Sequence, residues 1–247
     1  MPEKEMHLLD HLEELRRRIL ISAVAIIVIT AVALIFSDTL LKVLLIPSGG
    51  LRLKAFGLMD GFTIKFRIAL YIGVAAAFPV WGFELYRFIT PGLKDRERKA
   101  LFPGLLMSSC LFVLGVVFGY WLLGEMIHVM IGFIPPEVDF LPAADSYISF
   151  VTFFLVACGV AFQLPVVLTI LVQLRILTST ILRKQRKIAY FALFVFAEIV
   201  TPVSDPIVAP MAVMIPMLLL YEGSILIAIR IEAGRLKAAK SHPEIVG

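Results

Sequence analysis

Residues 11–36 read HLEELRRRILISAVAIIVITAVALIF, eight residues rich in charge followed by eighteen that carry none. Eighteen helical residues rise about 27 Å, close to the roughly 30 Å of a hydrocarbon core, so the second part predicts a membrane-spanning helix. In the first part Leu12, Leu15 and Ile19 recur at the spacing of one helical face. We therefore expect residues 1–18 to be an amphipathic segment that lies along the membrane surface.

Two interpretations of the charged part stay open. Glu13 and Arg17, and likewise Glu14 and Arg18, have the i,i+4 spacing of helical surface ion pairs, which is typical of a membrane-entry helix. Alternatively, one of the two carboxylates stays free to meet a cationic partner. The local charge pattern does not decide between the two interpretations.

The composition of the whole chain excludes a soluble globular domain, because 60% of the residues are hydrophobic and the mean hydropathy is +0.95. Six apolar runs predict an all-α polytopic membrane protein of one domain, with a six-helix bundle over 19–229 and a cytoplasmic tail over 230–247. The runs are Ile19–Phe36, Ile68–Phe83, Leu101–Leu123, Ile148–Leu174, Ile188–Val200 and Ile207–Ile229. No cleavage-site pattern accompanies the first run, so we expect it to be retained as an anchor.

The fifth and sixth helices are expected to be short. Ile188–Val200 has thirteen residues, which rise only about 20 Å. The sixth run contains Pro210 and Pro216, so we expect its regular helical part to be interrupted. A mismatch of this size with the bilayer is relieved by local thinning or by oligomerisation.

Lysine and arginine are distributed unevenly along the chain. Eighteen of the 23 belong to the N-terminal tail, the loop between spans two and three, the loop between spans four and five, and the C-terminus. The other five belong to the segments on the opposite side. The positive-inside rule therefore predicts a multi-pass protein of the cytoplasmic membrane with both termini in the cytoplasm.

Several segments of the chain occur in a recognisable order and spacing. They are HLEELRRR at 11–18, FPVWGFELYRFITPGLKDRERK at 78–99, SYISFV at 146–151, GVAFQLPVV at 159–167, and TP, DP and IPMLLLYE between 201 and 222. Together these segments resemble the TatC family of the twin-arginine translocase, and the resemblance covers roughly residues 7–230. It implies six helices in a cup-shaped receptor for the export of folded proteins, driven by the proton-motive force.

The resemblance also implies partners. These are twin-arginine signal peptides of folded precursors, single-span membrane proteins of the TatA and TatB types, membrane lipid, and further copies in an assembled oligomer. It implies no enzymatic activity, no cofactor, no metal and no nucleic acid.

Site residues follow from the resemblance by motif. Glu14 and Arg16 match the HLxELR motif, and Phe88, Pro91 and Glu97 match the motif FIxPGLxxxE. The family implicates the two carboxylates in holding the paired arginines of the signal. The chemistry fits, because a planar guanidinium makes bidentate bonds to a carboxylate that a lysine cannot reproduce. Read alone, Glu97 is more simply explained as neutralising the basic residues beside it, in solvent-exposed pairs worth about 0–1 kcal/mol.

Further positions match the family with less specific roles. Five of them are expected to be structural, namely Pro47, Phe62, Pro79, Asp145 and Tyr147. For the prolines a helix end or kink is at least as good an explanation, and Phe62 could cap the outer face.

Polar residues in the fourth to sixth spans predict a site for a partner helix or an intramembrane polar site. They are Gln163, Glu198 and Glu222. Gln163 stands where the family usually has Glu, so it can hydrogen-bond but cannot ionise. An interhelical hydrogen bond and a partner's transmembrane helix explain it equally well.

Small residues and cysteines carry weaker signals. Gly115 and Gly119 form a GxxxG pair, most simply explained by tight packing inside one protomer. Cys110 and Cys158 lie in apolar runs without CxxC or histidine partners, so we expect both to be buried and unpaired.

Two other classes of function are weighed against the receptor. A secondary carrier could use the three polar residues of spans four to six, but it predicts repeated halves, and spans 1–3 and 4–6 show no such symmetry. An intramembrane protease needs a nucleophile and a histidine at membrane depth, whereas all four histidines lie outside the spans.

Overall fold

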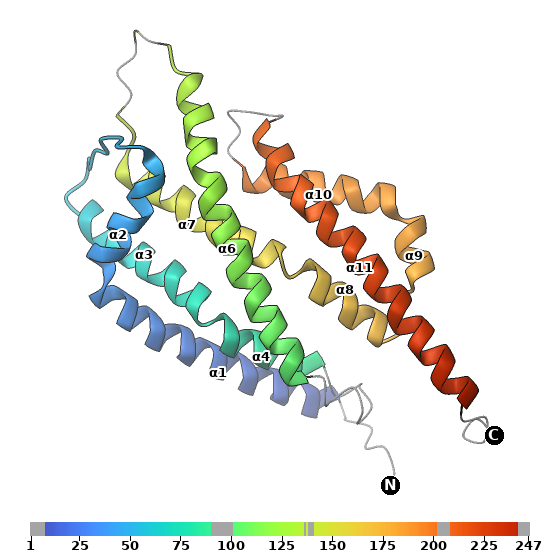
Figure 1. Ribbon diagram of the computed structural model, residues 1–247. Helices are drawn as coiled ribbons and strands as arrows, with labels where there is room; N and C mark the ends of the chain where they lie inside the picture. Colours follow the sequence, from blue (N-terminus) through green and yellow to red (C-terminus); the bar gives the residue numbers. More distant parts are fainter. Residues whose placement is uncertain (1–7, 90–100, 136, 138–140, 202–207, 242–247) are drawn as a thin grey trace. The chain divides into compact units, whose positions relative to one another are not determined.

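The computed structural model describes residues 8–89, 101–135, 137, 141–201 and 208–241, and these are almost entirely helical (Figure 1). The elements are α1 (Leu8–Ile35), α2 (Ser37–Leu45), the 3₁₀ turn η1 (Ile46–Ser48), α3 (Asp60–Ala76), α4 (Phe78–Ile89), α6 (Leu101–Gly132), α7 (Ala144–Ala161), α8 (Leu164–Gln173), α9 (Ser179–Lys184), α10 (Arg186–Val200) and α11 (Val208–Ser241). They form two compact units, residues 1–159 and 160–247.

The predicted all-α membrane fold is confirmed. Among the described residues, four helical stretches are long and apolar enough to cross a membrane, and the bent pair α3–α4 makes a fifth. The four are 11–35, 104–132, 144–173 and 209–235. The helix α10 has only 15 residues and ends at Val200, so the prediction of a short fifth helix is also confirmed.

The first unit is built on close contact between α1 and α3, which lie side by side in Figure 1. At Gly73 a side-chain carbon would fall 3.0 Å from the Cα of Thr30, so only glycine allows the two backbones to come this near. Ile68 and Ala69, on the same stretch of α3, are completely buried. The chain then turns so that α4 also packs against α1 on one side and α6 on the other.

A break separates α3 from α4, and the two axes differ by 49°. Pro79 is the second residue of α4, where a helix tolerates proline because the missing N–H has no carbonyl partner there. The indole N–H of Trp81 donates to the carbonyl of Val74 at 2.9 Å, which satisfies an acceptor near the end of α3. The sequence placed Pro79 inside one span, and the structure divides that span into two helices.

The helices α6 and α7 pack through small residues. A side chain at Gly119 would meet Cys158 at 2.9 Å, and one at Gly159 would meet Phe112 at 2.9 Å. For Gly119, one member of the glycine pair, this agrees with tight packing inside one protomer. Cys158 is buried as expected, but Cys110 is exposed on α6, so the prediction that both cysteines are buried is wrong for Cys110. An apolar run in a membrane helix has a lipid-facing side, and hydropathy alone does not tell which residues lie on it.

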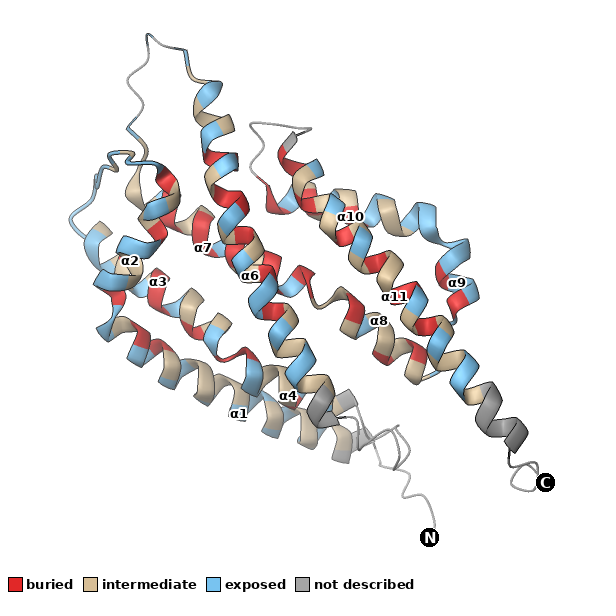
Figure 2. Ribbon diagram, in the orientation of Figure 1, coloured by how far each residue is buried: buried red, intermediate tan, exposed pale blue. Residues whose placement is uncertain are grey.

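In the second unit α8, α9 and α10 all pack on α11. The buried residues of α11 recur every three or four positions, so one face of this helix forms the core of the unit (Figure 2). They include Val213, Met217, Tyr221, Ile225 and Ala228.

The prediction of a short, interrupted sixth helix is wrong, because α11 runs without a break for 34 residues. Pro210 lies in its first turn, where a missing N–H costs nothing. Pro216 removes one hydrogen bond inside a helix whose buried face continues on both sides of it.

Candidate functional site

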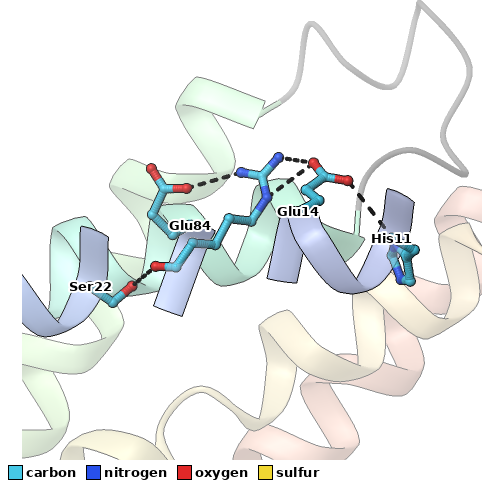
Figure 3. A network of polar contacts seen from close by, with 5 residues as sticks. His11, Glu14, Ser22 and Glu84 are labelled. Atoms are coloured by element: carbon cyan, nitrogen blue, oxygen red, sulfur yellow. Dashed lines mark hydrogen bonds and ion pairs between the residues drawn. The ribbon is translucent and has the colours of Figure 1, made fainter. Parts of the chain in front are cut away.

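The guanidinium of Arg18 joins two carboxylates from different helices (Figure 3). Its Nε donates to Oε1 of Glu14 at 3.1 Å, and its Nη2 donates to the same oxygen. Its Nη1 donates to Oε2 of Glu84, on α4, at 3.0 Å. The Arg18 and Glu84 side chains are each only 11% exposed, whereas that of Glu14 is 25% exposed.

The ion pair between Glu14 and Arg18 is therefore present, as the first interpretation of the charged segment predicted. It occupies only one carboxylate oxygen. Among the described residues, Oε2 of Glu14 lies near Nδ1 of His11, but the distance of 4.0 Å is too long for a hydrogen bond. Oε2 of Glu14 can therefore still accept a hydrogen bond from a ligand.

A second contact ties α1 to α4 at this end of the unit. The ring of His11 stacks on Phe88 with centroids 4.3 Å apart and planes 14° from parallel. Phe88 lies one helical turn after Glu84 on α4, so the stacked rings and the ion pair fasten the same pair of helices. Together these contacts fix where Glu14 lies relative to α4.

An open pocket of about 810 Å³ lies over this network. Its lining residues are Glu13, Glu14, Arg16, Arg17, Arg18, Leu20, Ile21, Glu84 and Arg87. The described lining thus has four arginines and three glutamates. Arg18 is already bound by two of the glutamates, and Arg16 and Arg17 are exposed.

An apolar groove of about 410 Å³ adjoins the pocket, and Arg18 and Glu84 line both. The groove is formed by α1, α3 and α4, with Leu15, Ile19 and Trp81 among its residues. Arg18 and Glu84 therefore stand between a charged surface and an apolar one.

Five residues were predicted for a signal-binding site, and the structure describes three of them. Glu14 and Arg16 line the pocket, and Phe88 stacks on His11 and lines the adjoining groove. Glu97 and Pro91 lie outside the described residues.

The residues expected to be structural lie mostly at the other end of the first unit. Asp145 pairs with Arg67 at 2.9 Å, and the hydroxyl of the buried Tyr147 donates to the carbonyl of Leu44 at 2.9 Å. Pro47 is the middle residue of η1, which ends α2. Phe62 is 66% exposed and stacks on Phe66.

The three polar residues of the second unit have different surroundings. Gln163 is half-buried in the break before α8, where its backbone N–H donates to the carbonyl of Val160 at 2.9 Å. Glu198 is half-buried near the end of α10. Glu222 accepts hydrogen bonds from Arg186 and Tyr190, each at 2.6 Å, so its charge is balanced by Arg186, the first residue of α10.

Sequence reasoning missed Glu84, which is the second partner of Arg18. The available signal was a carboxylate inside a strongly apolar helix, since such a group needs a cationic partner. It also missed the tie between α11 and the first residue of α9, where Glu232 accepts from the backbone N–H of Ser179 at 2.8 Å and from its hydroxyl. Arg235 donates to the carbonyl of Gln173 at 2.7 Å and to that of Val172 at 3.1 Å, which caps the end of α8.

Comparison with known proteins gives one consistent family. The family profile described as Sec-independent protein translocase protein (TatC) matches residues 10–216. The TatC protein of Carboxydothermus hydrogenoformans is 34% identical over 231 residues, which cover 92% of this chain and 95% of that protein. The TatCy protein of Bacillus subtilis is 34% identical over 245 residues, covering 98% of this chain and 94% of that protein.

A solved structure agrees with these relatives. A crystal structure of the twin-arginine translocase receptor TatC in the detergent DDM superposes with a TM-score of 0.79 at 33% identity. The match covers 88% of this chain and 99% of that one.

Proposed function

Because this chain belongs to the TatC family of Sec-independent protein translocase proteins, we propose that it is the signal-binding receptor of its translocase. As a member of the family it is a polytopic membrane protein of protein transport and not an enzyme. The proposed ligand is the pair of consecutive arginines in the signal peptide of a folded precursor. The proposed site is the pocket at Glu14, on the cytoplasmic face of the membrane.

One observation carries this proposal: Glu14 already binds a guanidinium, that of Arg18, through two N–H groups. An arginine from a signal peptide has the same planar donor set, so the geometry around Glu14 suits it. The carboxylate is a quarter exposed and borders an open pocket, so a ligand can reach it.

A pair of arginines needs a second carboxylate, and Glu97 is the proposed one. It follows α4 in the sequence. In the last turn of α4, Arg87 lines the pocket and Phe88 lines the adjoining groove. Arg16, Phe88 and Pro91 are proposed to shape this site around the two acids.

The remaining expectations are proposals of the same kind. Single-span partners of the TatA and TatB types are proposed to contact the second unit, where Gln163 and Glu198 are half-buried polar groups in apolar helices. Glu222 is a weaker candidate, because Arg186 and Tyr190 already occupy it. Pro47, Phe62, Pro79, Asp145 and Tyr147 are proposed to be structural. Assembly into an oligomer, contact with membrane lipid and transport driven by the proton-motive force complete the proposal.

The test is binding of a fluorescent twin-arginine peptide to the detergent-solubilised chain. The substitution Glu14→Gln removes the charge and keeps the shape, so we expect at least tenfold weaker binding, about 1.4 kcal/mol. Glu13→Gln is the matched control, because Glu13 lines the same pocket but is exposed. Equal affinity of the Glu14→Gln variant and the unaltered chain would refute the site.

A further inference from the structure

The resident arginine poses a problem for any cationic ligand. Arg18 occupies Oε1 of Glu14, and the described pocket lining has one more arginine than it has glutamates. A neutral Glu14–Arg18 pair offers an incoming guanidinium no net attraction. The second carboxylate on Arg18 changes this balance.

We propose that Glu84 is a positioning residue that holds Arg18 while Glu14 turns to the ligand. This inference rests on the proposed function of Glu14. Glu14, Arg18 and Glu84 together carry a net charge of −1, which one incoming guanidinium neutralises. Before binding, the two carboxylates share one arginine. After binding, each carboxylate has its own, since Glu14 pairs with the ligand and Glu84 pairs with Arg18.

The geometry allows this exchange without moving Arg18. Glu14 binds the edge of the guanidinium that bears Nε and Nη2, whereas Glu84 binds Nη1. Loss of the Glu14 contact therefore leaves the Glu84 contact of 3.0 Å intact. The two carboxylates also belong to different helices, α1 and α4, so a rotation of the Glu14 side chain does not require one of Glu84.

Burial explains why a second carboxylate is needed. The Arg18 side chain is only 11% exposed, and a charge in such a place is costly when it loses its only partner. Without Glu84, release of Glu14 would leave the guanidinium with no carboxylate partner among the described residues. Glu84 thus lowers the cost of freeing Glu14, although it need not touch the ligand.

Two other roles for Glu84 make different predictions. If Glu84 binds the signal peptide directly, its effect on affinity does not depend on Arg18. If it serves only to join α1 to α4, its loss lowers stability and does not interact with Arg18 in binding. A double-mutant comparison separates these roles from the proposed one, because it measures the coupling between the two side chains.

The experiment measures binding of the same twin-arginine peptide to the chains with Glu84→Gln, with Arg18→Gln and with both substitutions, which are the variants that a double-mutant cycle requires. In the Arg18→Gln chain Glu84 has no arginine to hold, so the further change Glu84→Gln should not weaken binding. We expect Glu84→Gln to weaken binding about tenfold, because Arg18 is then no longer shared with Glu84 and cancels the charge of Glu14. We expect the double variant to bind at least as tightly as the unaltered chain, because Arg18 no longer competes with the ligand for Glu14. The double variant carries two uncharged amides in place of an ion pair, so it leaves neither partner as a buried lone charge.

The proposal is overturned if Glu84→Gln binds as tightly as the unaltered chain, or if the double variant binds as weakly as Glu84→Gln. Thermal unfolding of each variant checks that weaker binding does not reflect a smaller folded fraction. Failure of the receptor function has a different signature. In that case the unaltered chain does not bind the peptide, or Glu14→Gln leaves binding unchanged.

Discussion

The close approach between α1 and α3 in the first unit predicts a strong effect for one methyl group. In the substitution Gly73→Ala the new Cβ would lie 2.0 Å from Oγ1 and 3.0 Å from the Cα of Thr30. Rotation of the threonine side chain relieves the first contact, but the second is with the backbone of α1. Ordinary contact begins near 3.4 Å, so the two helices must separate by several tenths of an ångström.

The expected cost is that of overpacking a core, about 1–3 kcal/mol of unfolding free energy. The assay is equilibrium unfolding of the purified chain in a mild detergent, followed by circular dichroism. Gly61→Ala is the matched control, because Gly61 belongs to the same helix and the added carbon would meet no described atom within 4 Å apart from its neighbours in the chain and in the helix backbone. Its expected effect is between zero and a stabilisation of about 1 kcal/mol, from the higher helix propensity of alanine.

A second variant tests the cause of the effect. Thr30→Ala removes the hydroxyl nearest to the new methyl group but leaves the backbone, so the double variant with Gly73→Ala should regain part of the lost stability. The hydroxyl of Thr30 is buried without a hydrogen-bond partner among the described residues, so its removal alone should cost little. Equal unfolding free energies for Gly73→Ala and Gly61→Ala would refute the close packing of α1 on α3.

Two further substitutions test ties between distant segments. Tyr147→Phe leaves the carbonyl of Leu44 without its donor in a buried place, so we expect the unfolding free energy in detergent to fall by about 1–3 kcal/mol. Glu232→Ala removes both acceptors of Ser179 at the start of α9, so we expect faster amide hydrogen exchange at Ser179 and faster tryptic cleavage after the exposed Arg183. An unchanged unfolding curve for the first variant, or unchanged exchange and cleavage for the second, would count against these ties.

Apolar run length predicted the described helices well where a run is uninterrupted. The first run was expected to end at Phe36, and α1 ends at Ile35; the fifth was expected to end at Val200, and α10 does. Membrane helices satisfy their own backbone, so run length and helix length are closely linked. Prolines make the relation between run length and helix length fail in two opposite ways. Pro79 begins a new helix at a bend, whereas Pro216 lies inside a continuous one.

Local spacing predicted only part of the candidate site. The pair of Glu14 and Arg18 follows from the i,i+4 rule, and the structure contains it. The bond from Arg18 to Glu84 joins residues 66 positions apart, and no local rule reaches that far. It depends on the bend between α3 and α4 and on the packing of α4 against α1, which are tertiary features.

The contact between Arg18 and Glu14 bears on the choice between arginine and lysine in a signal. Arg18 gives Glu14 two N–H donors from one edge of a rigid plane, so an arginine that replaces it restores both contacts. A lysine ammonium is a single charged point. When a ligand lysine replaces Arg18 on Glu14, two directed hydrogen bonds are lost and one is formed. On the proposed mechanism a ligand must therefore bind Glu14 as strongly as the guanidinium of Arg18 does. A ligand arginine meets this requirement and a ligand lysine does not. A peptide with two lysines should accordingly bind more weakly than the twin-arginine peptide, and the difference should shrink when Arg18 and Glu84 are both replaced by glutamine.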